Sequence, residues 1–278
     1  MAKNKTINIG AHSAQFADLN VKGEQMKIDG ESFYKISNVN GMRPFFMSIV
    51  SHSNHWMFIS STGGLSAGRK DCDSALFPYY TDDKITDSFE TTGSKSIFLV
   101  EKNSQTFLWE PFSSRHVSLY KISRNLYKNA FGNKVIFEEI NHDLEISFTY
   151  EWNSTDRYGF VRKSLLSNAG TSQVKVQFID GIQNVLPFGI EQALQNSTSN
   201  LVDAYKRTEL VAGSSLAVFA LSAIIVDKAE PSEALKSNVA WSIGLDNPTI
   251  LLSSLQLDAF RRGQQVSQET DVKAEKGA

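Results

Sequence analysis

The sequence predicts a mostly β fold, an antiparallel sandwich that also carries one or two short helices. Short segments rich in Phe, Val, Ile and Thr recur along the 278 residues, and Gly, Asn and Asp turn signals separate them. Helical periodicity is confined to two short stretches. Many strands joined by short turns, with few helical periods between them, are typical of antiparallel sandwiches.

The clearest strand covers residues 143–153, with the sequence DLEISFTYEWN. Its apolar residues occupy alternate positions: Leu144, Ile146, Phe148, Tyr150 and Trp152. A period of two over this length predicts a half-buried strand. The segment KVIFEEI, residues 134–140, precedes it across the turn Asn141-His142-Asp143. The two segments are therefore predicted to form a hairpin.

Further strands are predicted on both sides of this hairpin. They cover residues 45–50, 55–60, 96–102, 106–112, 158–168, 173–182, 215–226, 239–244 and 249–257. Strand alternation fails in residues 189–210, where Leu194, Leu201 and Tyr205 suit one or two helical turns. A second short helix is predicted over residues 230–237, with Pro231 in its first turn.

The composition excludes several classes of protein. Charged residues make up 21% of the chain, the net charge is −2 and basic residues are not in excess, so neither nucleic acid nor an anionic membrane is expected as a partner. The single cysteine, Cys72, cannot form an intrachain disulfide, which fits a reducing compartment. The polar N-terminus lacks the apolar core of a signal peptide. A cytoplasmic protein is therefore expected.

The domain organisation is predicted from the polarity and the apolar periodicity of the two ends of the chain. Residues 1–25 are polar and weakly patterned, so they are interpreted as an N-terminal arm. Residues 26–278 are predicted to form a single β domain. The C-terminal end reads as a strand and turn cut in mid-sequence, so we expect this domain to come from a longer protein.

The glycine-rich stretch after the strand at residues 55–60 is close to a phosphate-binding loop. Gly63 and Gly68 have the spacing of a Walker A motif, but Arg69 stands at the lysine position and Lys70 at the hydroxyl position. Pro78 is also too close for the helix that should follow. A nucleotide triphosphatase is therefore not predicted. The stretch from Thr62 to Asp83 is instead interpreted as one loop that leaves the edge of a strand. Its glycines are expected to permit a sharp turn or a close approach of the backbone to a ligand.

No metal centre or catalytic residue is predicted. Asp71 and Asp73 could share a face as calcium ligands, but no dense acidic loop surrounds them, so a solvated turn is favoured. His52 and His55 lie beside a turn with no third ligand nearby, which favours a structural or surface role. Cys72 has no paired histidine visible in the sequence, and no Gly-x-Ser-x-Gly elbow occurs.

Aromatic side chains are the strongest candidates for ligand contact, since flat amphipathic rings stack on sugars. Trp56, Trp109 and Trp152 are available, and the position of Trp152 on the apolar face of its strand predicts a core role. Tyr79 and Tyr80 instead lie among hydrogen-bonding residues, which suits a polyhydroxylated ligand. The predicted substrate-binding residues are Thr62, Gly63, Gly64, Arg69, Tyr79, Tyr80 and Asp82.

Several runs together resemble the N-terminal region of large bacterial proteins of the cellobiose phosphorylase-like family. They cover residues 54–85, 108–112, 124–140, 195–210, 230–237 and 255–263. The resemblance spans roughly residues 30 to 278 and implies a galactose mutarotase-like β-supersandwich that precedes a helical (α/α)₆ barrel. It also implies disaccharide phosphorolysis or hydrolysis, with the general-acid aspartate in the barrel beyond residue 278. No residue of this chain inherits the catalytic role.

The resemblance further implies what such a domain contacts. In this family the β domain supports the barrel, contributes to dimer contacts and lends a loop to the active site, so a homodimer and the chain's own downstream domain are expected partners. Inorganic phosphate is a potential co-substrate of the parent enzyme, and no cofactor is expected. Cellobiose phosphorylases continue after Thr-Gly-Gly with an aromatic and an Arg-rich segment, whereas this chain has Leu65, Ser66 and Ala67. The sugar and the choice between phosphorolysis and hydrolysis therefore stay open.

Two functions other than the one implied by the resemblance are also compatible with the sequence. A stand-alone carbohydrate-binding or mutarotase-like protein would need an acid and a base that meet across a sheet. His116, His142, Glu138 and Glu139 are available for this, and the sequence does not place them together. A structural module that dimerises through an exposed sheet face is the other alternative.

Overall fold

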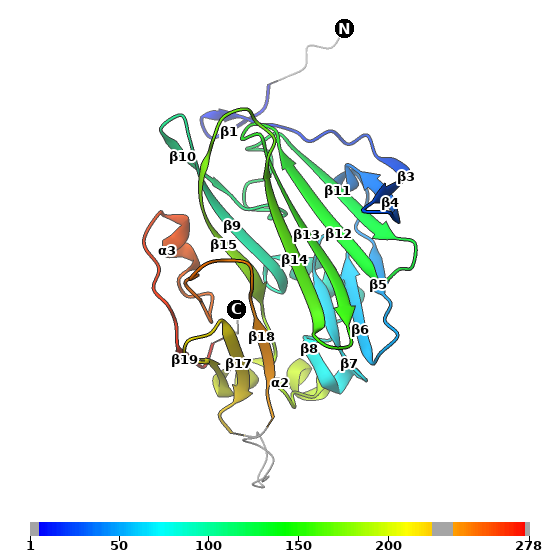
Figure 1. The fold of residues 1–278 in the computed structure, drawn as a ribbon, viewed down its shortest axis with the longest axis vertical. Helices are drawn as coiled ribbons and strands as arrows, with labels where there is room; N and C mark the ends of the chain where they lie inside the picture. The colour runs from blue at the N-terminus through cyan, green and yellow to red at the C-terminus, as the bar shows by residue number, and fades with distance from the viewer. Residues whose placement is uncertain (1–5, 224–235, 276–278) are drawn as a thin grey trace. The chain divides into compact units, whose positions relative to one another are not determined.

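The computed structural model describes residues 6–223 and 236–275 of the chain. The described residues form a mostly β fold with several small antiparallel sheets and few short helices, which confirms the predicted fold class at this level (Figure 1). The chain divides into two compact units. The first unit comprises Met1–Ser53, Ser60–Gly63 and Ser96–Ile179. The second comprises Asn54–Ile59, Gly64–Lys95 and Asp180–Ala278.

A six-stranded antiparallel sheet dominates the first unit, with the strand order β14-β13-β12-β11-β4-β3. The strands are β3 (Lys22–Ile28), β4 (Glu31–Ser37), β11 (Ile122–Asn129), β12 (Lys134–Asn141), β13 (Ile146–Thr155) and β14 (Gly159–Asn168). The predicted hairpin of residues 134–153 is confirmed as β12 and β13, with Lys134 opposite Asn153. β13 begins at Ile146 because the preceding residues form a turn, in which Leu144 N–H donates to Asn141 Oδ1 and Glu145 has φ 58°.

One face of this sheet is the core of the first unit. Phe137 and Tyr150 stack there with ring centroids 4.8 Å apart, and Trp152 is 2% exposed, which confirms its predicted core role. A three-stranded sheet packs on this face, with the order β10-β9-β15. Its strands are β9 (Gly93–Lys102), β10 (Gln105–Trp109) and β15 (Lys175–Gln183), of which β9 from Ser96 and β15 up to Ile179 belong to this unit. Phe98 of β9 meets Phe148 of β13 with centroids 5.1 Å apart. The packing of aromatic rings therefore joins the two sheets of this unit.

Shorter elements complete the first unit. They are β1 (Asn8–Ile9), β2 (His12–Ser13), the 3₁₀ turn η1 (Val39–Gly41) and β5 (Phe46–Ile49). β3 begins at Lys22, so the residues interpreted as an N-terminal arm include the start of a sheet strand. The single domain predicted over residues 26–278 stays a prediction.

The second unit contains two groups of strands and the helices. β6 (His55–Ser60), β7 (Leu65–Arg69) and β8 (Ala75–Phe77) pair in antiparallel fashion. β16 (Lys206–Leu210), β17 (Leu216–Leu221), β18 (Asn238–Trp241) and β19 (Asp271–Lys273) form a sheet with the order β18-β17-β16-β19. The helical elements are η2 (Cys72–Ser74), α1 (Asp82–Asp87), η3 (Ser88–Glu90), α2 (Gln192–Tyr205) and α3 (Leu257–Arg261).

The structure corrects three predictions in this unit. The strand predicted over residues 249–257 is wrong, because the Leu252 N–H donates to the side chain of Glu269 rather than to a neighbouring strand, and α3 begins at Leu257. Residues 189–210 contain the predicted helix, α2, but they end in a strand, β16. The stretch from Thr62 to Asp83 is not one loop, since β7, β8 and the start of α1 lie within it.

Two predictions reach residues that the structure does not describe. The helix predicted over residues 230–237 falls largely outside the described residues, as does the end of the strand predicted over 215–226. Among the described residues, no helix has both the length and the apolar character that a membrane crossing requires.

Candidate functional site

The glycines of the stretch that follows β6 make room for the protein's own groups. Gly63 has φ 97°, and a Cβ there would lie 2.6 Å from Tyr150 Oη within the first unit. A Cβ on Gly64 would lie 1.9 Å from the carbonyl oxygen of Ile85, and one on Gly68 would lie 2.5 Å from a ring carbon of Trp56, both within the second unit. These separations are far below contact distance, so the turn and close approach expected of the glycines serve internal packing.

Trp56 and Tyr79 form an aromatic pair in the second unit. Trp56 lies opposite Gly68 in the β6–β7 register, and its ring packs over that glycine. The indole Nε1–H donates to the carbonyl oxygen of Asp71 at 3.1 Å, which fixes the ring's orientation. Tyr79 meets the indole edge-on, with centroids 5.5 Å apart and an interplanar angle of 83°. Both side chains are half-buried, so part of each ring is open to solvent.

Tyr80, the next residue, contacts helix α2 through a polar pair. Gln195 Nε2 of α2 donates to Tyr80 Oη at 3.3 Å. The start of α2 is held by Asp73, whose Oδ1 accepts the Gln192 N–H at 2.9 Å, and this bond takes the place of a local cap. Trp56–Tyr79 and Tyr80–Gln195 are two pairs that adjoin at neighbouring residues of the chain, and we refer to them together as the aromatic cluster. Gln195 has no signal in the sequence that sets it apart from the other glutamines, so sequence reasoning missed it.

The remaining predicted contacts are spread over different elements. Arg69 is the exposed last residue of β7, opposite His55 in the β6–β7 register. Asp82 is the exposed first residue of α1. Thr62 belongs to the first unit with Gly63, and its hydroxyl donates to Ser60 Oγ at 3.0 Å. In the structure, therefore, Tyr79 contacts Trp56 and Tyr80 contacts Gln195. The other predicted residues are placed elsewhere: Arg69 ends β7, Asp82 begins α1, and Thr62 belongs to the first unit.

The metal candidates have protein partners. Asp73 caps α2, and His52 Nε2 lies 2.7 Å from Asp156 Oδ2 on an exposed surface. His55 is buried in β6. Over residues 6–223 and 236–275, no group of three His, Cys, Asp or Glu side chains is arranged to hold a metal ion.

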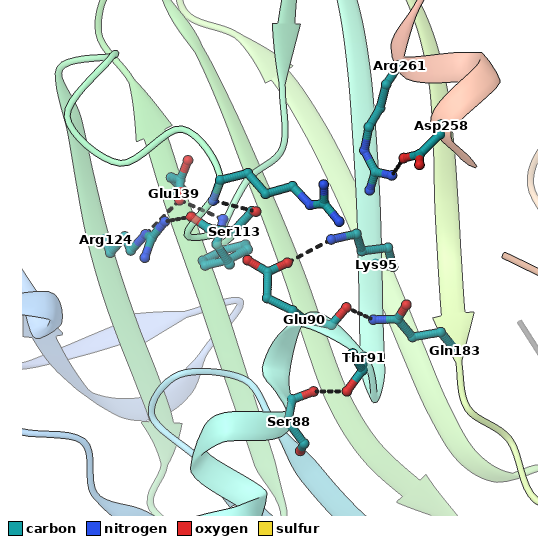
Figure 2. Close-up of polar contacts among 12 residues, drawn as sticks. Ser88, Glu90, Thr91, Lys95, Ser113, Arg124, Glu139, Gln183, Asp258 and Arg261 are labelled. Carbon is teal, nitrogen blue, oxygen red and sulfur yellow. Dashed lines mark hydrogen bonds and ion pairs between the residues drawn. The ribbon is translucent and has the colours of Figure 1, made fainter. Parts of the chain in front are cut away.

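A polar cluster of the second unit lies beside η3, and no sequence pattern indicated it (Figure 2). Lys95 Nζ forms an ion pair with Glu90 Oε2 at 2.9 Å, and the two side chains are 11% and 23% exposed. Gln183 Nε2 donates to the carbonyl oxygen of Glu90 at 2.9 Å, and Thr91 Oγ1 donates to that of Ser88. These bonds fix the backbone where η3 leads into β9. The polar cluster is therefore explained by a structural role and is not a candidate ligand site.

Glu139 is a buried carboxylate whose hydrogen bonds are satisfied within the first unit. It is 1% exposed and accepts bonds from Trp109 Nε1 at 2.8 Å, Phe112 N–H at 2.7 Å and Arg124 Nε at 2.7 Å. Arg124 also donates to the carbonyl oxygen of Ser113 at 3.0 Å (Figure 2). The network ties the segment after β10 to strands β11 and β12, and Trp109 belongs to it rather than to an open surface.

Glu138 points to the opposite face of β12, as expected for the neighbouring residue of a strand. It accepts bonds from Asn125 Nδ2 at 2.7 Å and Tyr127 Oη at 2.6 Å. Burial and the bond to Glu138 raise the pKa of Tyr127. His142 Nε2 lies 2.9 Å from Ser123 Oγ. Glu138 and Glu139 are therefore on separate faces and do not form a pair.

Comparison with known proteins gives no assignment, since neither a protein-family model nor a curated protein sequence matches this chain.

Proposed function

We propose that this chain is a non-catalytic, carbohydrate-associated β domain of a glycoside phosphorylase or glycoside hydrolase. In this proposal it adopts a galactose mutarotase-like supersandwich, supports a downstream (α/α)₆ catalytic barrel and lends the segment around Tyr79 and Tyr80 to the sugar site. Its partners are then a di- or oligosaccharide and its own catalytic domain, with inorganic phosphate as co-substrate if the parent enzyme is a phosphorylase.

The observation that carries the proposal is the aromatic cluster. Trp56 and Tyr79 are half-buried and held edge-to-face, so their rings are fixed in orientation while both residues keep some exposure to solvent. Fixed aromatic rings bind the apolar faces of sugars at a low cost in conformational entropy, and Tyr80 and Gln195 add hydrogen-bonding groups from the adjoining residue and α2.

The carboxylates of the first unit favour a non-catalytic domain over a mutarotase-like one. Glu139 accepts three hydrogen bonds and is 1% exposed, which suits a structural group. Glu138 already accepts bonds from Asn125 and Tyr127 on the other face of β12. An acid–base pair needs two groups that converge on one substrate, and Glu138 and Glu139 diverge, so these two carboxylates do not form such a pair with each other.

Ligand-observed NMR with glucose, galactose and cellobiose tests the proposal on the full chain. A domain that contributes part of a sugar site should bind one of these weakly, with a Kd of about 1 mM or above. Submicromolar binding would instead favour a stand-alone carbohydrate-binding protein. Absence of saturation transfer from the protein to any of these sugars would overturn the proposed sugar contact.

A further inference from the structure

Gln195 is a buried amide with an unused hydrogen-bonding atom. The residue is 6% exposed in the first half of α2, and its Nε2 donates to Tyr80 Oη at 3.3 Å. Its Oε1 is buried and has no hydrogen-bond partner. A buried polar atom without a partner costs stability, so its presence calls for an explanation beyond packing.

The opposite orientation of the amide does not remove this cost. The oxygen and nitrogen of a glutamine amide exchange places when the group is turned by half a revolution. The oxygen would then accept the Tyr80 hydroxyl proton, and the NH₂ group would occupy the position that lacks a partner. Either orientation leaves one end of the amide unsatisfied, next to a half-buried tyrosine.

We propose that Gln195 and Tyr80 form a subsite for one hydroxyl group of a neutral sugar, and that this subsite sets sugar specificity. The proposal rests on the proposed function, in which the neighbouring residue Tyr79 and its partner Trp56 contribute a ring surface to the sugar site. A hydroxyl group both donates and accepts, so it satisfies the free end of the amide in either orientation. Gln195 and Tyr80 are both uncharged, which suits a neutral sugar rather than an anion.

The subsite is closed when no ligand is bound, since the free atom of Gln195 has almost no contact with solvent. Tyr80 holds the other end of the amide, Nε2, through a bond of 3.3 Å, at the long end for a hydrogen bond. The helix is interrupted at Thr198, which has φ −142° and ψ 42°, three residues beyond Gln195. Entry of a ligand then requires a shift of the Tyr80 side chain alone or of the short helical segment before Thr198.

The test replaces Gln195 by methionine, which keeps the volume of the side chain and removes both polar atoms. Gln195→Met should weaken the binding of the best-bound sugar by roughly two- to tenfold, the range expected for one hydrogen bond. Its midpoint in urea should equal or exceed that of the parent, because the unsatisfied atom is gone. Gln265→Met, at an exposed glutamine of the same unit, is the matched control and should change neither quantity.

Monodeoxy glucoses identify the hydroxyl and separate this inference from the proposed function. One deoxy analogue should bind the parent and Gln195→Met equally, whereas the others should keep the difference. Tyr80→Phe should show the same pattern, which guards against a folding defect in a single variant. Unchanged sugar affinity in both variants, with weakened binding in Trp56→Ala, would overturn the subsite and leave the proposed function standing. Absence of sugar binding by the parent protein would overturn both.

Discussion

Individual residues of this protein show how the same residue type takes different roles within one strand. Glu138 and Glu139 are neighbours in β12, yet one lies on the core face with Arg124 and the other on the opposite face with Tyr127. Their sequence, a pair of glutamates inside an apolar strand, predicts only that they diverge. Their partners come from a neighbouring strand and a loop, so which of them is buried could not be predicted from the sequence.

Replacement of Glu139 by alanine should strongly destabilise the protein. It would leave the Arg124 guanidinium, the Trp109 indole N–H and the Phe112 N–H without their acceptor. Breaking a buried ion pair costs about 3–5 kcal/mol. Urea denaturation of Glu139→Ala measures this loss.

The matched control is Glu101→Ala, which breaks an exposed ion pair of nearly equal length. Glu101 Oε1 lies 2.8 Å from Lys175 Nζ, and the side chains are 44% and 67% exposed. Exposed pairs contribute about 0–1 kcal/mol, so this variant should unfold close to the parent. Equal losses in the two variants would contradict the role assigned to Glu139.

At the scale of elements, a strand could be predicted from the sequence where apolar and polar side chains alternate along it. The hairpin β12–β13 was predictable because its apolar residues repeat with a period of two. Residues 249–257 are as apolar as a strand, but the Glu269 side chain, 17 residues beyond Leu252, accepts a hydrogen bond from their backbone instead. The sequence identified Trp56 and Tyr79 as candidate ligand contacts. It did not predict that the indole of Trp56 packs on Gly68.

The packing of β7 against α1 gives a prediction for Gly64. Its Cα is so close to the backbone of Ile85 that an added Cβ would lie 1.9 Å from a carbonyl oxygen. Gly64→Ala should therefore displace α1 and cost about 1–3 kcal/mol or more in the free energy of unfolding. Chemical denaturation followed by circular dichroism gives the value.

Gly181→Ala serves as the control for this substitution. Gly181 lies in β15, a Cβ there would meet no atom within 4 Å, and its φ is not in the left-handed region. Alanine should be tolerated or should stabilise the protein by about 0.4–1 kcal/mol. A Gly64→Ala variant as stable as Gly181→Ala would contradict the close approach of Gly64 to the backbone of Ile85 in α1.

At the scale of the whole molecule, the half-buried Tyr120 makes the free energy of unfolding depend on pH in the alkaline range. Burial raises the pKa of Tyr120 to about 12, and the nearby Asp143 carboxylate adds to the shift. The unfolded chain loses this phenolic proton near pH 10, whereas the folded chain retains it to about pH 12. The contribution of the protonated Tyr120 to the free energy of unfolding is therefore fully present below about pH 10. Stability should fall as the pH rises from about 10 to about 12.

Urea midpoints measured between pH 8 and about 12 test this dependence. Tyr120→Phe should show a shallower decline than the parent over the same range, although it also loses the bond that Tyr120 donates to the Leu108 carbonyl oxygen. Tyr158→Phe, at a tyrosine that is 50% exposed, should follow the parent. A decline in Tyr120→Phe as steep as that of the parent would refute the assignment.

The central claim is that this β domain contacts sugar through the aromatic cluster, and a pair of tryptophan variants tests it most directly. Trp56→Ala removes the ring that packs on Tyr79, whereas Trp241→Ala removes a tryptophan of the same unit that is 46% exposed in β18. The measurement is the Kd of the best-bound sugar for each variant, by NMR titration. We predict about tenfold weaker binding in Trp56→Ala and unchanged binding in Trp241→Ala. Equal affinity in Trp56→Ala and the parent protein would contradict the account.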